Sequence, residues 1–323
     1  MADKAILVAL SKLEDKHRAI YEQAAKGSAH NCDIRFMKTE DVTENDLSGV
    51  NGIIGYVDAG LLHAANALEW IHLSWSGVDA FIKPGVLSED VTVCNARGAH
   101  GLAVSEHMVA LTMMLVRRLY AYRDNQKRHH WEMLGNTISI EGATIAVLGI
   151  GNIGGDYARK VHAMGAHVIG VRRTNGEKPE GVDEQVTIED LDKILPRADI
   201  VAMNLPGGEA TLNLMDERRL RLMKKGAYLV NVGRGASIDQ KALAAVLQDG
   251  HLGGAALDVC VPEPLPENDP LWDAPNLVLT PHVASNYLLA ETFERFVRIS
   301  AENLKRYANG VALENVVDRA TGY

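Results

Sequence analysis

The chain has 323 residues, enough for two domains that each bury a core of their own. With 47% hydrophobic and 23% charged residues, its composition is that of an ordinary globular protein. A net charge of −9 with no basic block argues against a nucleic-acid or anionic-membrane partner. The three cysteines lie far apart and form no CxxC pair, which argues against disulfides and against a zinc site.

The first apolar run, residues 5–10, soon meets charged residues and is too short to span a membrane. We interpret it as a core strand rather than a signal peptide, and we expect a cytoplasmic protein. A helix is predicted at residues 15–26, ended by Gly27. Further strands are predicted at residues 33–37, 52–56, 70–73 and 91–94. This alternation of strands and helices indicates an α/β layer with a parallel sheet.

Two of these strand ends carry residues that could meet a ligand, because ligands gather at the carboxyl ends of parallel strands. Tyr56 ends one strand, and Ser76, Gly77 and Val78 follow the next. The backbone amides of Gly77 and Val78 form either an anion-binding nest or an ordinary strand-to-helix turn. The residues alone leave both interpretations open.

A glycine-bracketed linker, residues 97–101, separates this half from a long apolar segment. Residues 102–119 predict a helix that is apolar on almost every face. Such a helix must be buried, either between domains or against another subunit. The polar run at residues 123–130 then indicates a crossing at the surface.

Residues 144–174 have the order strand, glycine-rich turn, helix, strand that a dinucleotide-binding fingerprint needs. The glycines permit a tight turn, close approach of the backbone to a pyrophosphate, and close packing of helix on strand. The helix N-terminus then faces the phosphates. A purely structural turn is the alternative. The expected contacts of the turn are Gly149, Gly151, Asn152, Ile153 and Gly154.

The end of the second strand in this unit indicates which dinucleotide binds. NAD sites usually carry Asp or Glu about 20 residues beyond the fingerprint, where this chain has Arg172, Arg173 and Thr174. Guanidinium groups can clamp a 2′-phosphate bidentately, whereas a carboxylate would repel it. We therefore predict NADP, with NAD as the alternative, and no metal.

Strands and helices continue to alternate after the fingerprint. Strands are predicted at residues 198–205, 228–232, 255–259 and 277–280, and helices at 216–223, 239–248 and 288–309, with a proline-rich excursion at 262–275. The last helix is expected to run back over the first domain. We therefore predict an α/β protein of two doubly wound parallel-sheet domains, residues 1–98 with 288–323 and residues 99–287, with hinges near 97–101 and 285–288.

Three strand ends in the second half carry reactive side chains, namely Arg234, Glu263 and His282. Arginine can bind a carboxylate bidentately and polarise a neighbouring carbonyl. Histidine can pass a proton to an oxygen near neutral pH, and a glutamate on its other nitrogen fixes the tautomer. Together they suit hydride transfer coupled to proton transfer on a 2-keto acid. Each residue alone also has an ordinary interpretation: a surface arginine flanked by glycines, a loop glutamate between prolines, and a histidine at the edge of the core.

Five motifs in register, GIGNIG, LPGGEAT, NVGRGASID, ALDVCVPEPLP and LTPHVAS, resemble the D-isomer-specific 2-hydroxyacid dehydrogenase family across about residues 97–290. The resemblance implies a Rossmann nucleotide-binding domain and a flavodoxin-like substrate domain around a cleft. It also implies a homodimer formed through the nucleotide domains, acting on a small 2-keto or 2-hydroxy acid.

Carried over residue by residue, the resemblance makes His282 the acid/base, Glu263 its partner, and Arg234 the ligand of the substrate carboxylate and carbonyl. The amides of Gly77 and Val78 would also hold the substrate carboxylate. Further expected cofactor contacts, with Pro206 on the adenine side and Asp258 on the nicotinamide side, are Leu205, Pro206, Thr211, Val232, Gly233, Asp258 and His282.

Differences from some members of the family narrow the range of members that this chain resembles. Glu263 stands where the family's formate dehydrogenases have Gln, and Arg172 resembles the NADP-preferring glyoxylate/hydroxypyruvate reductases. Tyr56, Trp75 and His100 either line the pocket for the substrate side chain or serve core packing. Two alternatives remain: a nucleotide-sensing protein like the family's transcriptional co-repressors, and a phosphite dehydrogenase on the same fold.

Overall fold

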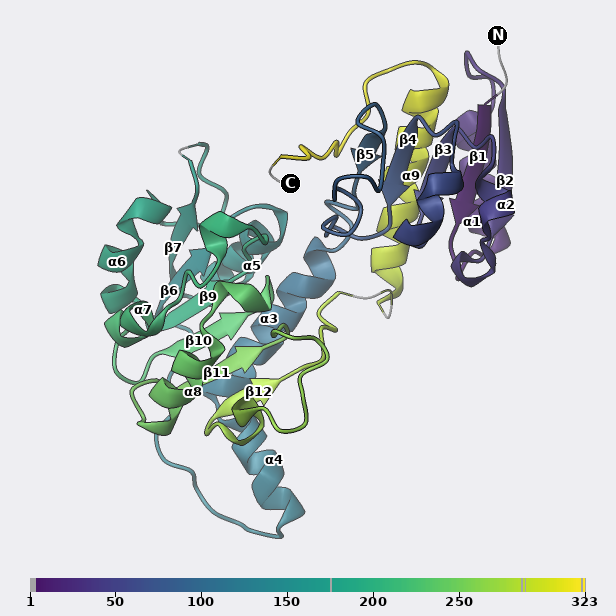
Figure 1. Ribbon diagram of the computed structural model, residues 1–323. Helices are drawn as coiled ribbons and strands as arrows, with labels where there is room; N and C mark the ends of the chain where they lie inside the picture. Colours follow the sequence, from purple (N-terminus) through teal and green to yellow (C-terminus); the bar gives the residue numbers. More distant parts are fainter. Residues whose placement is uncertain (1–3, 175, 286, 288, 321, 323) are drawn as a thin grey trace. The chain divides into compact units, whose positions relative to one another are not determined.

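The computed structural model describes residues 4–174, 176–285, 287, 289–320 and 322. The chain divides into two compact units, which we call unit 1 (Met1–His100 with Tyr287–Tyr323) and unit 2 (Gly101–Asn286). Each unit is built on a parallel sheet, so the predicted fold class is confirmed (Figure 1). Leu288, where we expected the last helix to begin, lies outside the described residues.

Unit 1 contains a five-stranded sheet in the order β2-β1-β3-β4-β5, with every neighbouring pair parallel. This is the flavodoxin-like order. Each strand lies within one residue of its predicted bounds at either end. The strands are β1 (Lys4–Ala9), β2 (Cys32–Met37), β3 (Gly52–Gly55), β4 (Trp70–Leu73) and β5 (Thr92–Cys94).

The helices of unit 1 come from both ends of the chain. They are α1 (Asp15–Ala25), α2 (Glu44–Leu47) and α9 (Ala290–Ala308), with 3-10 turns η1 (Thr39–Asp41) and η2 (Ala59–Ala64). Helix α9 is strongly amphipathic, because Phe293, Phe296 and Val297 recur at the spacing of one helical face. That face joins Ile6 and Val8 of β1 in one core, so the last helix covers the first sheet (Figure 1).

Unit 2 contains a seven-stranded parallel sheet in the order β12-β11-β10-β9-β6-β7-β8. The strands are β6 (Thr144–Leu148), β7 (His167–Arg172), β8 (Glu184–Thr187), β9 (Ile200–Met203), β10 (Tyr228–Asn231), β11 (Gly254–Leu257) and β12 (Leu277–Leu279). All were predicted except β8. This edge strand is only half-buried and mixes polar with apolar residues, so it lacks the apolar run that marks the others.

Helices cover both faces of this sheet. They are α3 (Gly101–Val116), α4 (Leu119–Lys127), α5 (Asn152–Ala163), α6 (Leu191–Ile194), α7 (Glu217–Leu222) and α8 (Gln240–Gln248), with 3-10 turns η3 (Ile188–Asp190), η4 (Leu195–Arg197), η5 (Glu209–Thr211), η6 (Gly235–Ser237) and η7 (Pro270–Asp273). Successive residues of β6 enter different cores: Ala146 and Leu148 join one cluster, and Ile145 and Val147 the other. A sheet buried on both faces explains the continuous apolar runs of its strands.

Two expectations concern the region around α3. Glu106 and Ala110 are exposed, so within the chain this apolar helix is not buried on every face. Arg118, with a φ of 55°, separates it from α4. The polar run at 123–130 lies at the surface as predicted, exposed at every position except Asn125, and its first part, through Lys127, is helical. Burial of the outer face of α3 against another subunit stays a prediction. Within the described part of the chain, no helix has the length and apolar character that a membrane crossing requires.

Candidate functional site

The parallel sheet of unit 2 places the carboxyl ends of its strands at one edge, and the predicted residues follow those ends. Their order along the edge is set by the order of the strands. From one side to the other, the residues are His282 after β12, Asp258 and Glu263 after β11, Arg234 after β10, Leu205 and Pro206 after β9, Gly149 after β6, and Arg172 at the end of β7. The reactive side chains of Arg234, Glu263 and His282 therefore follow strands at one side of the edge, and Arg172 lies at the other side.

His282 and Glu263 form a direct pair. The histidine Nδ1 lies 2.8 Å from a carboxylate oxygen of Glu263, and both side chains are partly exposed, at 51% and 38%. The other carboxylate oxygen accepts the backbone amide of Cys260 at 3.0 Å. Since an ionised carboxylate only accepts, the proton of this bond belongs to Nδ1. The pair leaves Nε2 of His282 as the nitrogen that can exchange a proton with a ligand.

Asp258 holds the segment that carries His282. The residue is 1% exposed, and its carboxylate accepts hydrogen bonds from the Thr280 hydroxyl at 2.6 Å and from the amides of Val283 and Ala284, both at 2.9 Å. Its backbone carbonyl accepts the amide of His282 at 2.8 Å. His282 has a φ of 50°, in the left-handed region that residues other than glycine rarely adopt. The hydrogen bonds to Asp258 therefore hold the histidine in an unfavourable backbone conformation.

The loop that carries Arg234 has little freedom. A Cβ on Gly233 would lie 2.6 Å from the carbonyl oxygen of Leu205, so the loops after β9 and β10 touch backbone to backbone. The side chain of Asn231 accepts the amide of Gly233 at 3.0 Å and donates to the carbonyl of Arg234 at 2.9 Å. The Arg234 side chain is half-buried and donates through Nη1 to the carbonyl of Gly233 at 2.9 Å. These contacts fix the backbone from which the side chain of Arg234 extends.

The glycine turn after β6 has the form expected of a phosphate-binding turn. Gly149 adopts a φ of +93°, and a Cβ on Gly154 would lie 1.8 Å from the carbonyl oxygen of Gly149, so neither position tolerates a side chain. Gly151 is the exposed N-cap of α5, whose first turn contains Asn152 and Ile153. Asn204 fastens the turn by donating to the carbonyl of Gly149 at 2.7 Å. A helix N-terminus reached through exposed glycine is a suitable anion site.

The remaining predicted cofactor residues lie along the same edge. Arg172 donates through Nη1 to the carbonyl of Glu177 at 3.0 Å, while Arg173 and Thr174 are exposed. In the loop after β9, the hydroxyl of Thr211 donates to the carbonyl of Pro206 at 2.8 Å. Val232 is 9% exposed and contributes to the core beneath the loop that carries Arg234.

In unit 1 the predicted substrate residues follow β3 and β4. Tyr56 packs edge-on against Phe81, with ring centroids 5.9 Å apart. The side-chain amide of Asn95 donates to the carbonyl of Ser76 at 3.0 Å, and the side chain of Val78 is buried. Among the described residues, the backbone amides of Gly77 and Val78 donate no hydrogen bond to another residue. These amides are therefore available to an anion.

An aromatic stack also follows β4. Trp75 and His100 lie nearly parallel, with ring centroids 6.0 Å apart and an angle of 13°, and Tyr287 lies 5.5 Å from Trp75. His100 Nε2, at 3.1 Å, and the Tyr287 hydroxyl both bond the carbonyl oxygen of Ser74. Burial lowers the pKa of His100 and raises that of Tyr287. Trp75, in the same stack, stays 37% exposed.

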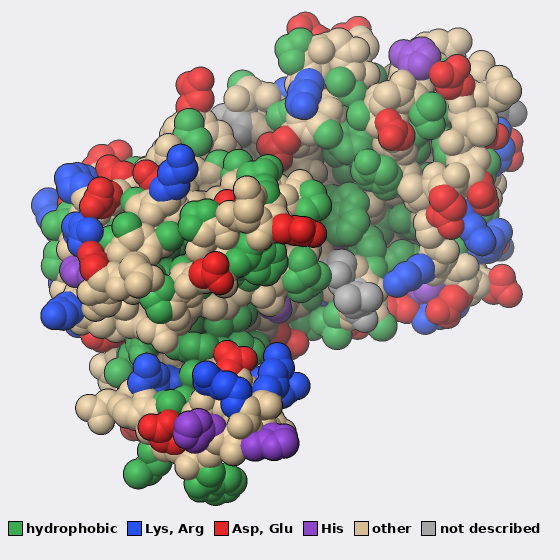
Figure 2. Space-filling model, turned by 60° about the horizontal axis from the view of Figure 1, so that its bottom comes forward, with side chains coloured by type: hydrophobic (Ala, Val, Ile, Leu, Met, Phe, Trp, Pro, Cys, Tyr) green, Lys and Arg blue, Asp and Glu red, His purple; other side chains and the backbone are tan. Residues whose placement is uncertain are grey.

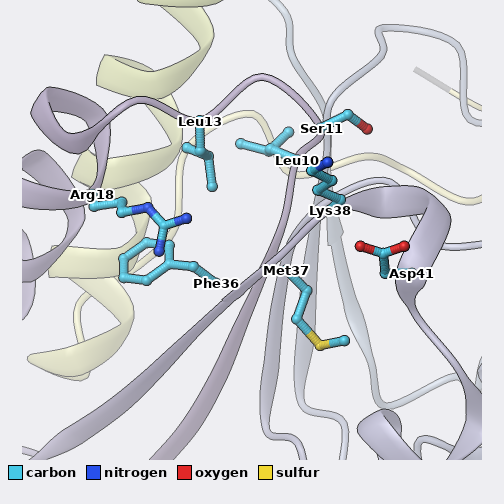
Figure 3. A pocket seen from close by; sticks show the side chains of 8 residues that line it. All are labelled: Leu10, Ser11, Leu13, Arg18, Phe36, Met37, Lys38 and Asp41. Atoms are coloured by element: carbon cyan, nitrogen blue, oxygen red, sulfur yellow. The ribbon is translucent and has the colours of Figure 1, made fainter.

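A pocket of about 300 Å³ lies elsewhere in unit 1, at the carboxyl ends of β1 and β2. Figure 3 shows Arg18 beside the ring of Phe36, with 5.2 Å between the guanidinium carbon and the ring centroid. None of the predicted site residues lines this pocket. Within the described part of the chain, no group of three or more His, Cys, Asp or Glu side chains is arranged to hold a metal ion.

Sequence reasoning missed the polar side chains that position the site. They are His107, Asn204, Asn231, Gln240 and Thr280. Gln240 joins the backbone of Val261 through two hydrogen bonds of 2.7 Å, close to Glu263. A signal was present for two of them. His107 interrupts an apolar helix, and Asn231 ends an apolar strand directly before the arginine motif.

The family model described as D-isomer specific 2-hydroxyacid dehydrogenase, NAD binding domain, matches residues 109–284. The chain is 33% identical over 253 residues to the glyoxylate reductase of Thermofilum pendens, a match that spans 77% of this chain and 74% of the relative.

Two solved structures share the fold. One is a D-isomer specific 2-hydroxyacid dehydrogenase family protein from Aeromonas salmonicida subsp. salmonicida, with 30% identity, a TM-score of 0.83, and coverage of 98% of this chain and 100% of that one. The other is the NADPH-dependent glyoxylate/hydroxypyruvate reductase of Sinorhizobium meliloti in complex with NADP and sulfate. It shows 27% identity, a TM-score of 0.82, and coverage of 99% and 100%.

Proposed function

Because the chain belongs to the D-isomer specific 2-hydroxyacid dehydrogenase family, we propose that it reduces a small 2-keto acid to the D-2-hydroxy acid with NADPH and catalyses the reverse oxidation with NADP. One observation carries the proposal: the His282–Glu263 pair lies at the sheet edge that also bears Arg234 and the glycine turn. This edge thus combines a histidine that can carry a proton, an arginine that can bind a carboxylate, and a turn that can bind a nucleotide, and this combination suits the reaction.

The residues present fit a dinucleotide. The turn from Gly149 to Gly154 offers the N-terminus of α5 to the pyrophosphate, and the loop after β9 offers Leu205, Pro206 and Thr211. Val232, Gly233 and Asp258 follow the strands nearer to His282, on the nicotinamide side. When bound, the nicotinamide supplies or accepts the hydride.

The preference for NADP rests on the end of β7. Arg172 and Arg173 stand where a carboxylate would bind the ribose of NAD, and Arg173 and Thr174 are exposed. Two guanidinium groups can pair with a 2′-phosphate. The reductase of Sinorhizobium meliloti, which is named NADPH-dependent and was solved with NADP, is a similar protein, which supports this part of the proposal.

The acid–base chemistry is assigned to His282. In the direction of reduction, its Nε2 donates a proton to the carbonyl oxygen of the substrate, and Glu263 at Nδ1 stabilises the charged imidazole beforehand. Arg234 binds the substrate carboxylate and polarises the carbonyl. The amides of Gly77 and Val78 are proposed as further donors to the carboxylate, with Tyr56 and Ser76 near them on the same unit.

We also expect a homodimer. Trp131 and Met133 are almost fully exposed after α4, and the outer face of α3 leaves Ala110 exposed. Figure 2 shows hydrophobic side chains protruding beside Lys, Arg and His side chains at the lower end of the view, where Figure 1 places α4. Exposed apolar side chains of this size are typical of an interface. Sedimentation velocity of the purified chain would show a dimer at micromolar concentration, whereas a monomer would contradict this expectation.

The reaction is tested by following the loss of NADPH, and separately of NADH, with glyoxylate, hydroxypyruvate, phenylpyruvate and a branched 2-keto acid. We expect turnover with at least one of these acids, and faster turnover with NADPH. The relative rates would rank the space available to the substrate side chain. Tight nucleotide binding without turnover of any acid would overturn the proposal in favour of a nucleotide-sensing protein.

A further inference from the structure

His107 lies on α3, far in sequence from the reactive side chains, yet it reaches the segment that carries His282. Its Nε2 lies 3.2 Å from the hydroxyl oxygen of Thr280 and 3.6 Å from a carboxylate oxygen of Asp258. The histidine side chain is 23% exposed and that of Asp258 is fully buried. A polar side chain of a largely apolar helix thus meets the residues that anchor the loop of His282.

The direction of these hydrogen bonds follows from the number of protons. Thr280 has one hydroxyl proton, and the 2.6 Å bond to the carboxylate of Asp258 uses it. A carboxylate only accepts, so the Thr280 oxygen is left to accept from His107. The imidazole proton therefore sits on Nε2. His107 therefore donates to Thr280, and Thr280 donates to Asp258.

Asp258 then fixes the backbone of the His282 segment at both ends. Thr280 precedes His282 and donates to Asp258 through its side chain, whereas Val283 and Ala284 follow it and donate through their amides. Between these anchors, His282 keeps its left-handed φ of 50°. Such a conformation persists only where surrounding contacts over-determine it.

We propose that His107 is a positioning residue for His282, acting through Thr280 and Asp258. The inference rests on the proposed function, because it assigns the acid–base role to His282. By donating to Thr280, His107 polarises the hydroxyl and strengthens its bond to Asp258. The chain of hydrogen bonds keeps the imidazole of His282 at the angle set by Glu263, so its loss lowers the rate of proton transfer more than it weakens binding.

The test compares two variants of one residue. His107→Leu removes the donor, and His107→Gln keeps an N–H donor. We expect kcat for the best 2-keto acid to fall roughly 5-fold in His107→Leu, as loss of one hydrogen bond implies, with KM and the Kd for NADPH within about twofold. His107→Gln should recover most of kcat. Glu106→Gln, at the exposed neighbouring position, is the control and should leave kcat unchanged.

A second measurement needs no turnover. In the protein without nucleotide, hydrogen exchange in peptides covering residues 280–285 should be faster in His107→Leu than in the wild type, and near the wild-type rate in His107→Gln. Unchanged exchange and unchanged kcat in His107→Leu would overturn the inference. So would a His107→Gln variant as impaired as His107→Leu.

Thr280→Val tests the same chain if His107→Leu does not fold. In that case Thr280→Val alone should speed exchange in the peptides covering residues 280–285 and lower kcat, and unchanged exchange and kcat would contradict the path. Where His107→Leu does fold, the variant with both substitutions should be no slower than Thr280→Val alone, and additive losses would contradict the path. The outcome is separable from that of the proposed function. A wild type that reduces no 2-keto acid refutes the function, and hydrogen exchange still decides whether His107 anchors the segment.

Discussion

The two units use their buried polar side chains in different ways. In unit 1 several of these side chains lie in the core, where the Tyr21 hydroxyl meets that of Ser300 at 2.7 Å and Asn303 donates to His72 at 3.1 Å. In unit 2 one such pair, Thr112 with Tyr157 at 2.9 Å, also lies in the core, but the site depends on those at the ends of the strands, where Asp258 holds the loop of the catalytic candidate His282.

The difference lies in which parts of each unit these hydrogen bonds connect. The bonds of unit 1 join its sheet and first helix to α9, a helix more than 200 residues away in the chain, so they secure the assembly of the unit. The bonds of unit 2 join loops that leave neighbouring strands, so they set how side chains are presented. Substitutions in the first set should therefore change stability, and substitutions in the second should change turnover.

The largest expected effect concerns a side chain that the loops of unit 2 position at the site. His282→Ala removes the proton carrier, and kcat should fall by about 10²- to 10⁴-fold, the usual contribution of a general acid. NADPH affinity, measured by fluorescence titration, should change little. His162→Ala, on the exposed side of α5, is the control. Full turnover in His282→Ala would refute its role.

Two adjacent glycines of α5 allow a steric requirement for glycine to be distinguished from the low helix propensity of glycine. A Cβ on Gly154 would lie 1.8 Å from a backbone oxygen, whereas one on Gly155 would come no closer than 3.9 Å to another atom. Gly154→Ala should therefore lower the free energy of unfolding by about 1–3 kcal/mol and weaken NADPH binding. Gly155→Ala should stabilise α5 by about 0.5–1 kcal/mol. Urea denaturation of both variants checks the contrast; equal effects would contradict it.

The buried histidine of unit 1 predicts a pH effect on stability. Burial lowers the pKa of His72 to about 3, from an ordinary value of 6.5. Below pH 6.5 the unfolded chain binds a proton at this residue and the folded chain does not, so stability is lost as the pH falls from 6.5 toward 3. By pH 5 the loss attributable to His72 is about 2 kcal/mol.

His72→Phe keeps a ring against Phe296 and cannot titrate, so its free energy of unfolding should fall less between pH 7 and pH 5 than that of the wild type. Denaturant titrations at both pH values measure the difference. Parallel pH dependence in the two proteins would show that His72 is not the titrating group.

A further prediction concerns the cofactor. Arg172→Asp places a carboxylate near the proposed 2′-phosphate, so the ratio of kcat/KM for NADPH to that for NADH should fall by roughly tenfold, as loss of a charge-assisted hydrogen bond implies. Arg298→Asp, at an exposed arginine of unit 1, should keep the ratio. A ratio that stays constant in Arg172→Asp would remove Arg172 from the phosphate site.

Much of the fold could be predicted because buried parallel strands are marked locally. In unit 2 the inner strands β6, β9, β10 and β11 are apolar runs that end at Gly, Asn or Asp, and the third glycine of the turn is required by a backbone contact five residues away. Strand β8 was missed because its half-buried edge position demands no apolar run.

The residues that position the site were harder to predict. Arg234, Glu263 and His282 stand at strand ends in recognisable motifs. His107 and Thr280, in contrast, are 173 residues apart and meet only because α3 packs on the sheet near β11. Pairing of this kind depends on tertiary packing, which no local pattern in one sequence records.

The most direct test of the account follows the hydride itself. NADPH deuterated at the transferring C4 position of the nicotinamide would be incubated with hydroxypyruvate, and the product analysed by NMR and by chiral chromatography. The account predicts glycerate of D configuration with one deuterium at C2. Product without deuterium at C2, product of L configuration, or no product from any 2-keto acid would contradict the assignment of Arg234, Glu263 and His282 to a D-specific 2-keto acid reductase.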